Sequence, residues 1–216
     1  MRGLFISFEG IEGSGKTTQI SMLSEHLSAR GRPVQLTREP GGTLIGDQVR
    51  KILLDPANAA LDPRAELLLY AAGRAQHLAE LIRPALEAGT IVLCDRFSDA
   101  TSAYQGYGRG LDLDLIGNLD RLVTGGMRPD LTVLLDIDAS GGLARARGRN
   151  SRHGLEAEAR FENERLPFHE RVRRGYLELA KQEPGRFSVV DASPRPEEIQ
   201  KEIRRIVDQL LNAEAN

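Results

Sequence analysis

The chain has 216 residues, of which 40% are hydrophobic and 28% charged, and its formal net charge is −2. This length and composition fit one globular domain with a substantial core, and the near-neutral charge excludes a nucleic-acid polymer as the main partner. The one cysteine, Cys94, cannot form an internal disulfide, which favours a reducing compartment. The sequence starts with a strand-like segment and not a secretory leader, and no apolar run approaches the ~18 residues of a membrane helix. We therefore expect a cytoplasmic protein without membrane contact.

Short apolar runs alternate with helix-like segments along the chain. The runs are rich in Ile, Val, Leu and Phe and lack polar alternation, as is typical of strands buried on both faces of a parallel sheet; they lie at 4–8, 34–37, 91–95, 131–136 and 187–191. Helical spacing predicts helices at 16–30, 63–88, 113–123, 165–181 and 196–211. This alternation predicts a doubly wound, three-layer α/β/α fold with a parallel sheet of five strands, whose ligands bind at the carboxyl ends of the strands.

The segment 145–164 is polar and contains almost no strand-like pattern. Between Gly142 and Gly175 there are nine arginines against five glutamates and no lysine, which indicates a local site for a small anion. We interpret residues 1–216 as a single domain with an arginine-rich lid, helical or loop-like, at about 145–164.

A phosphate-binding loop follows the first predicted strand. Residues 10–17, Gly-Ile-Glu-Gly-Ser-Gly-Lys-Thr, match G-x-x-x-x-G-K-[ST] between a strand and a helix. The glycines let backbone N–H groups converge on phosphate oxygens, and the helix N-terminus adds positive potential. Lys16 is suited to bridge the β- and γ-phosphates, and the Thr17 hydroxyl is suited to ligate Mg²⁺. The predicted nucleotide-binding residues are Gly10, Ile11, Glu12, Gly13, Ser14, Gly15, Lys16, Thr17 and Thr18.

Other nucleotide-binding classes fit less well. The dinucleotide fingerprint G-x-G-x-x-G fails at its third glycine, where the chain has Thr18, and the guanine-reading N-K-x-D motif of GTPases does not occur. A short chain with this loop near its start and an arginine-rich segment near residue 150 has the layout of a small-molecule kinase. In such kinases a lid excludes water, so that the phosphoryl group passes to the acceptor.

The third predicted strand ends in Asp95-Arg96. Asp95 is suited to ligate Mg²⁺ through water, unless it is only a strand-terminal surface acid. The planar guanidinium of Arg96 is suited to bind an acceptor phosphate in a bidentate way.

Several further segments form one ordered pattern that runs from the first strand to the last helix. They are Phe-Glu-Gly at 8–10, Thr-Arg-Glu-Pro-Gly-Gly-Thr at 37–43, Asp-Arg-Phe at 95–97, Ala-Tyr-Gln-Gly at 103–106 and Arg-Pro-Asp-Leu-Thr at 128–132. Together with the phosphate-binding loop, these segments resemble the bacterial thymidylate kinases, a family of P-loop nucleoside-monophosphate kinases. The resemblance covers essentially the whole chain.

The resemblance implies ATP-dependent phosphorylation of dTMP to dTDP in dTTP biosynthesis, with Mg²⁺ as cofactor and a homodimer formed through helices. The metal residues would be Thr17 and Asp95, and the substrate-binding residues would be Glu12, Arg38, Glu39, Arg50, Tyr70, Arg74, Arg96, Thr101, Tyr104 and Gln105. In this family pattern Glu12 accepts a hydrogen bond from the deoxyribose 3′-OH, and Arg38 and Arg96 lie near the dTMP phosphate. Tyr70 takes the place of the aromatic residue that stacks on thymine, and Arg74 donates to the base. Thr101 and Gln105 contact the base edge, and Tyr104 crowds the sugar C2′.

Two departures from the pattern concern Tyr70 and the lid. Family members often have Phe where this chain has Tyr70, which lies among apolar helical residues, so the sequence leaves core packing open as its role. Gly13 stands where some relatives have an arginine in the phosphate-binding loop. In this respect the chain resembles the bacterial type of the family, in which an arginine of the lid supplies the positive charge that the loop lacks. The candidate catalytic residues are therefore Lys16, Arg149, Arg145, Arg96 and Glu12, with Arg147 and Arg160 as weaker lid candidates. The four histidines lack ligand spacing and receive no task.

The expected reaction is direct in-line transfer from MgATP to the 5′-phosphate of dTMP, with no covalent enzyme intermediate. Two alternatives remain open on the sequence: a kinase for another small acceptor, such as dUMP or another nucleoside monophosphate, and a non-enzymatic nucleotide switch. The arginine-rich segment and the Asp95-Arg96 pair speak against the switch.

Overall fold

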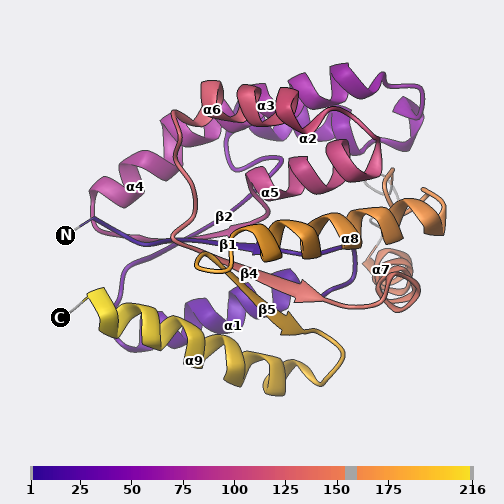
Figure 1. Cartoon of the computed structure of the whole chain (residues 1–216). Helices are drawn as coiled ribbons and strands as arrows, with labels where there is room; N and C mark the ends of the chain where they lie inside the picture. Colours follow the sequence, from indigo (N-terminus) through magenta and orange to yellow (C-terminus); the bar gives the residue numbers. More distant parts are fainter. Residues whose placement is uncertain (1, 154–159, 215–216) are drawn as a thin grey trace.

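The structure is a computed structural model that describes the backbone of residues 2–153 and 160–214 and the side chains of 2–148 and 160–212. Within these residues the centre of the molecule is one five-stranded parallel sheet in the order β2-β3-β1-β4-β5 (Figure 1). The strands are β1 (Phe5–Glu9), β2 (Val34–Arg38), β3 (Ile91–Asp95), β4 (Leu131–Asp136) and β5 (Phe187–Asp191). The order reverses direction at β1, so the crevice at the carboxyl end of β1 is the place where such folds bind ligands.

Helices cover both faces of the sheet (Figure 1). One face carries α1 (Lys16–Ala29) and α9 (Pro196–Glu214), which pack against each other. The other face carries a longer set of elements: α2 (Leu44–Leu54), η1 (Pro56–Asn58), α3 (Pro63–His77), η2 (Leu78–Ile82), α4 (Arg83–Glu87), α5 (Ser98–Thr101), η3 (Ser102–Gly108), α6 (Leu113–Thr124) and α8 (Leu166–Gln182). Helix α7 (Ala139–His153) lies at one end, beside the carboxyl edge of the sheet.

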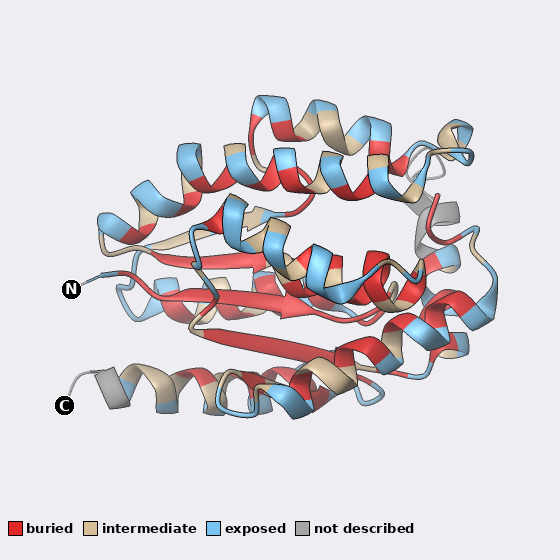
Figure 2. Ribbon diagram, turned by 45° about the horizontal axis from the view of Figure 1, so that its top comes forward, coloured by how far each residue is buried: buried red, intermediate tan, exposed pale blue. Residues whose placement is uncertain are grey.

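The three inner strands β1, β3 and β4 are buried almost throughout, whereas the edge strands β2 and β5 are partly exposed. Each covering helix buries the face that it turns toward the sheet (Figure 2). The core is mainly aliphatic, as the scarcity of aromatic residues predicts. The exception is an aromatic cluster beside the cleft, in which Tyr104 makes edge-to-face contacts with Phe161, Phe168 and Tyr176. Among the described residues, we find no helix with the length and apolarity needed to cross a bilayer.

The three-layer fold and the parallel sheet are confirmed, and the predicted strands differ from the observed ones by at most one residue at an end. The helix predictions differ more. The single helix predicted at 63–88 is α3, η2 and α4, with a π-helical turn at Leu78–Ile82. This turn ends two residues before Pro84, which has no backbone N–H to continue a regular α-helical ladder.

Four helical stretches are not among the predicted helices. They are α2, η1, the α5–η3 stretch and α7. The predicted lid at 145–164 begins inside α7, so its first part is a regular helix and not a loop. Helix α7 has a low mean hydropathy, which explains why its helical character is inconspicuous in the sequence.

Candidate active site

A cleft of about 1310 Å³ opens at the carboxyl ends of β1, β2 and β3. Pockets for one drug-sized ligand commonly measure on the order of 300–1,000 Å³, so this cleft has room for two small ligands. One half is lined by the phosphate-binding loop and Asp95, and the other by side chains from β2, α2, α3, α5 and η3. We call these the loop half and the acceptor half.

The loop half has the geometry of an anion cradle. Gly10, Gly13 and Gly15 have φ angles of 138°, 73° and 93°, which side chains rarely adopt. Helix α1 begins directly after Gly15 and has no side-chain N-cap, whereas α2 and α3 are capped by the side chains of Thr43 and Asp62. The first N–H groups of α1 are therefore left for a ligand, as in phosphate-binding loops.

The loop approaches α7 so closely that side chains are excluded from the contact. A Cβ at Gly13 would lie 2.0 Å from the carbonyl oxygen of Gly142, and a Cβ at Gly142 would lie 2.6 Å from the carbonyl oxygen of Glu12. This contact, together with its positive φ, gives a physical reason for glycine at position 13. It also joins the loop directly to the helix that leads into the predicted lid.

Lys16 is folded over the loop. Its Nζ donates to the carbonyl oxygens of Gly10 and Ile11, at 3.0 Å each. Burial, followed by the nearby charge of Arg96, lowers the pKa of Lys16 from 10.5 to about 8. A bound polyphosphate would favour the protonated lysine, since opposite charges favour the charged form.

Thr17 and Asp95 meet at the floor of the cleft. The Thr17 hydroxyl donates to Asp95 Oδ2 over 2.9 Å. Two neighbouring oxygen ligands of this kind fit Mg²⁺, which typically takes one or two protein oxygens and completes its octahedron with water and substrate phosphates.

Glu12 stands at the junction of the two halves. Its Oε1 accepts hydrogen bonds from Arg96 Nη2 at 3.1 Å and from the Tyr104 hydroxyl at 2.5 Å. Its Oε2 lies 3.1 Å from Nδ1 of His169, which is fully buried. Burial alone raises the pKa of Glu12, but the His169 hydrogen bond and the charge of Arg96 outweigh it, and the pKa falls to about 2. Glu12 is therefore a fixed, ionised acceptor at neutral pH.

Arg96 has an unusual backbone. Its φ of 70° is the one positive value found at a non-glycine residue in the described part of the chain. Such a conformation costs energy and persists only where the surroundings hold it. The guanidinium is held by Glu12, Tyr104 and Tyr176, whose hydroxyl accepts from Nη1 at 3.0 Å.

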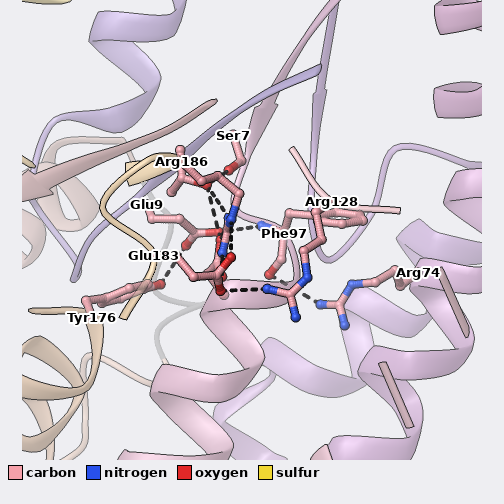
Figure 3. Close-up of polar contacts among 10 residues, drawn as sticks. Ser7, Glu9, Arg74, Phe97, Arg128, Tyr176, Glu183 and Arg186 are labelled. Atoms are coloured by element: carbon pink, nitrogen blue, oxygen red, sulfur yellow. Dashed lines mark hydrogen bonds and ion pairs between the residues drawn. The ribbon is translucent and has the colours of Figure 1, made fainter. Parts of the chain in front are cut away.

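Phe97, the next residue, forms hydrogen bonds through both its backbone N–H and its carbonyl (Figure 3). Its N–H donates to Glu9 Oε1 at 2.7 Å, and its carbonyl accepts from Arg74 Nη2 at 3.3 Å. The other Glu9 oxygen accepts from the Tyr176 hydroxyl at 2.7 Å. Burial, followed by the neighbouring charge of Asp99, raises the pKa of Glu9 from 4.5 to about 8. These contacts hold the Arg96 backbone in its strained conformation.

A second cluster of buried charge lies in the acceptor half. Arg74 Nε donates to Glu39 Oε2 at 2.8 Å, and Arg74 Nη2 donates to the Thr101 hydroxyl at 2.8 Å. The other Glu39 oxygen lies 3.0 Å from His77 Nδ1, and His77 Nε2 lies 2.6 Å from the Thr37 hydroxyl. All of these side chains except Thr37 are buried, so Arg74 is fixed at the cleft wall by its own ion pair.

The remaining predicted substrate residues also line the cleft. Tyr70 is half-buried and packs on the edge of the core, so its ring both contacts the core and faces the cavity. Arg50 donates to the Pro40 carbonyl, and the exposed Arg38 lies 3.5 Å from Asp47. Gln105 is buried and donates from Nε2 to Glu66. The structure thus brings every predicted substrate-binding residue to one cavity.

The predicted lid arginines are placed differently from one another. Arg145 lines the cleft, and its guanidinium donates to the carbonyl oxygens of Ala192 and Ser193. Arg147 donates to the carbonyl of Glu162, and Arg160 pairs with buried Glu66. Arg149 lies in α7, but its side chain is outside the described residues, as are residues 154–159 of the lid.

Comparison with known proteins agrees with this geometry. The sequence model of the family described as "Thymidylate kinase" matches residues 8–203. The chain belongs to the thymidylate kinase family. It is 58% identical to the thymidylate kinase of Syntrophotalea carbinolica over 208 residues, covering 96% of each chain. It is 56% identical to that of Solidesulfovibrio magneticus, covering 96% of this chain and all of the relative. The crystal structure of thymidylate kinase from Ehrlichia chaffeensis superposes with a TM-score of 0.76 at 37% identity, over 96% of this chain and 99% of that one.

The structure also adds side chains that sequence reasoning missed. His77 and His169, to which no task was assigned, each hold a site carboxylate from a fully buried position. Tyr176 and Glu66 were not singled out either, yet both contact predicted site residues. His169 and Glu12 are 157 residues apart, so no local spacing signals their contact.

Proposed function

We propose that this protein transfers the γ-phosphoryl group of ATP to the 5′-phosphate of dTMP, giving dTDP, by direct in-line displacement in the cleft described above. As a member of the thymidylate kinase family it is a kinase enzyme that uses ATP as phosphate donor. The observation that carries the proposal is the junction at Glu12 and Arg96, where an anion cradle and a buried, arginine-lined pocket share one cavity. Such a cavity holds two anionic ligands end to end, which is the geometry that phosphoryl transfer between nucleotides requires.

On the donor side, the loop N–H groups and Lys16 would hold the β- and γ-phosphates of ATP. Thr17 and Asp95 would hold Mg²⁺, because both are oxygen ligands 2.9 Å apart on the side of the cleft where the phosphates lie. When bound, Mg²⁺ neutralises charge on the phosphate oxygens. Removal of Mg²⁺ with EDTA is expected to stop turnover, and its re-addition is expected to restore it.

On the acceptor side, Arg96 would bind the dTMP phosphate, with Arg38 and Arg50 at the same rim of the cleft. Glu12 would accept a hydrogen bond from the sugar 3′-OH, for which its low pKa and fixed position are suited. Tyr104 would close the space at C2′. Tyr70, Arg74, Thr101 and Gln105 would surround the base, since they line the part of the cavity away from the loop.

We propose that residues 1–216 act as one domain and that the segment 145–164 acts as its lid. The close contact of Gly13 with Gly142 supports this, because it joins the phosphate loop to the helix from which the lid continues. A lid arginine, Arg149 or Arg145, would then stabilise the transferring phosphoryl group while the lid excludes water. The Arg145 hydrogen bonds to Ala192 and Ser193 favour Arg149 for this role.

The test is an ADP-release assay with MgATP and a panel of acceptors: dTMP, dUMP, dCMP, UMP, CMP, AMP and GMP. We expect strong turnover with dTMP, weaker turnover with dUMP and little with the rest. Strong turnover with a different acceptor would keep the kinase and reject the thymine pocket. ATP binding without turnover on any acceptor would favour the nucleotide switch.

We also propose that the protein is a homodimer that works in the cytoplasm, in dTTP biosynthesis. Support for the dimer comes from α3 and α6, which pack side by side and expose Leu68 at 58%, Leu115 at 47% and Leu122 at 80%. Sedimentation equilibrium is expected to give twice the chain mass, and Leu122→Glu is expected to shift the protein toward the monomer. Buried Cys94, an unpaired thiol, is consistent with a reducing compartment, which cell fractionation tests.

A further inference from the structure

Glu66 is a buried carboxylate that does not line the cleft, yet it contacts a side chain that does. It lies in the first turn of α3, and its side chain is 1% exposed. Oε1 accepts from Gln105 Nε2 at 2.7 Å, and Oε2 accepts from Arg160 Nη2 at 2.6 Å. Arg109 adds two longer contacts of 3.4 Å, from Nε and Nη2. Every partner of this carboxylate is a donor.

These contacts fix the polarity of the Gln105 amide. Glu66 forms ion pairs with Arg109 and Arg160, and a carboxylate in such pairs only accepts hydrogen bonds. A Gln105 amide turned by 180° would place its carbonyl oxygen against a carboxylate oxygen, so the NH₂ group must face Glu66. The carbonyl oxygen is then the group that Gln105 offers to the cleft, and none of the donors that we describe is bonded to it.

A carbonyl oxygen at this place discriminates between pyrimidines. Thymine carries a hydrogen on N3, which a carbonyl accepts, whereas cytosine carries a lone pair on N3. Two facing acceptors in a buried site leave both groups unpaired, which is costly. We infer that Glu66 is a specificity-determining positioning residue, which holds Gln105 in the orientation that selects a base with a hydrogen on N3. The inference rests on the proposed placement of the base beside Gln105.

The test compares dTMP with 5-methyl-dCMP, which keeps the methyl group and differs only at N3 and C4. The kcat/KM ratio of the two acceptors is measured for the full chain and for Glu66→Gln. A glutamine at 66 both donates and accepts, so it lets the Gln105 amide turn. We expect the ratio to fall by about tenfold or more. A purely structural role for Glu66 would lower both rates equally, and an unchanged ratio would overturn the inference.

Glu164→Gln is the matched control, because Glu164 also pairs with Arg109 but does not contact Gln105. Its ratio is expected to stay at the wild-type value; an equal fall in this variant would assign the effect to Arg109 and overturn the inference. In the Gln105→Met background, adding Glu66→Gln is expected to leave the ratio unchanged. A further fall there would show that Glu66 acts without Gln105, which also overturns it.

Loss of the Glu66 charge leaves Arg160 and Arg109 without their buried carboxylate, so the Glu66→Gln variant can fail to fold. Glu66→Asp then serves instead, since it keeps the charge for the arginines but withdraws the carboxylate from Gln105. The ratio is again expected to fall, and a wild-type ratio would overturn the inference. If the wild-type protein does not phosphorylate dTMP, the proposed function fails and this inference fails with it. If dTMP is used and the ratios do not move, only the inference fails.

Discussion

The loop half of the cleft comes mainly from one continuous segment, 10–18, together with Asp95, whereas the acceptor half comes from side chains spread between Arg38 and Gln105. The loop half works mainly through its backbone: left-handed glycines, an uncapped helix and one lysine over two carbonyls. The acceptor half works through buried side-chain charge, in the Glu12–Arg96 and Glu39–Arg74 pairs.

This difference has physical consequences for the two ligands. A backbone cradle recognises any phosphate chain, because N–H groups and a helix terminus carry no base preference. Buried ion pairs are rigid and directional, since each partner is fixed by the other, and so they can discriminate between acceptors. We therefore expect changes in the loop half to remove catalysis, and changes in the acceptor half to alter affinity and selectivity.

The largest effect is expected from Lys16→Ala. Its Nζ is held over the loop whose N–H groups would bind the phosphate chain, so its loss removes transition-state charge compensation. We predict turnover below about a thousandth of the wild-type rate. The turnover of Lys16→Ala is measured by quantifying dTDP in a stopped assay, and circular dichroism checks that the variant is folded. Wild-type-like turnover in a folded variant would contradict the account of the loop half.

The next largest effect is expected from Arg149→Ala. By analogy with arginine fingers, it should lower kcat on the order of 10³-fold with little change in KM for dTMP. Arg147→Ala is the matched control from the same helix, since Arg147 already donates to the Glu162 carbonyl. A loss confined to KM would demote Arg149 to a positioning residue, and an equal loss in both variants would remove its special role.

A smaller effect is expected from Arg96→Lys, which keeps the charge but removes the planar fork. One lost hydrogen bond between charged groups corresponds to about 1.5–3 kcal/mol, so kcat/KM for dTMP should fall roughly 10–100-fold. Arg128→Lys, at an exposed pair with Glu183, is expected to leave kcat/KM unchanged. Full activity of Arg96→Lys would show that a point charge suffices in the acceptor half.

The smallest effect is a pH dependence of stability that originates at Glu9. The raised pKa, about 8 against 4.5, means that the folded protein keeps a proton on Glu9 that the unfolded chain releases between these pH values. The contribution of Glu9 to the free energy of unfolding therefore falls as the pH rises from 4.5 to 8. Glu9→Gln removes this titration, so its melting temperature relative to wild type should rise from pH 5 to pH 8. A change of about 1 kcal/mol corresponds to roughly 2–4 °C for a chain of this size. If the difference in melting temperature between Glu9→Gln and the wild type did not vary with pH, the raised pKa of Glu9 would be contradicted.

Elements with strong local signals could be predicted from the sequence alone. The runs that form β3, β4 and β5 have the predicted bounds. Short apolar stretches bounded by polar residues are typical of buried strands in an α/β fold, so both their type and their ends could be predicted. The residues of the loop half could be named from the sequence, since its glycines, Lys16 and Thr17 lie within the eight-residue motif 10–17. In contrast, η2 and η3 depend on tertiary packing, and no sequence pattern marks a π-helical turn.

The acceptor half was predicted only through resemblance to a family. The residues predicted to bind the substrate line one cavity, but the partners that hold them were not predicted. Arg160, a weaker candidate for the lid arginine, pairs with Glu66, 94 residues away. Burial of a charged pair is a property of the folded chain, and in the sequence Glu66 and His169 look like ordinary helix residues.

The central claim is that the acceptor half is built before ATP binds and independently of the loop lysine. Isothermal titration calorimetry of dTMP against the nucleotide-free protein and against Lys16→Ala tests it most directly. The account predicts that dTMP binds both proteins with dissociation constants within about threefold of each other, a difference of only about 0.65 kcal/mol. If dTMP binding required ATP, or were lost in a folded Lys16→Ala variant, the claim of two separately built halves would be contradicted.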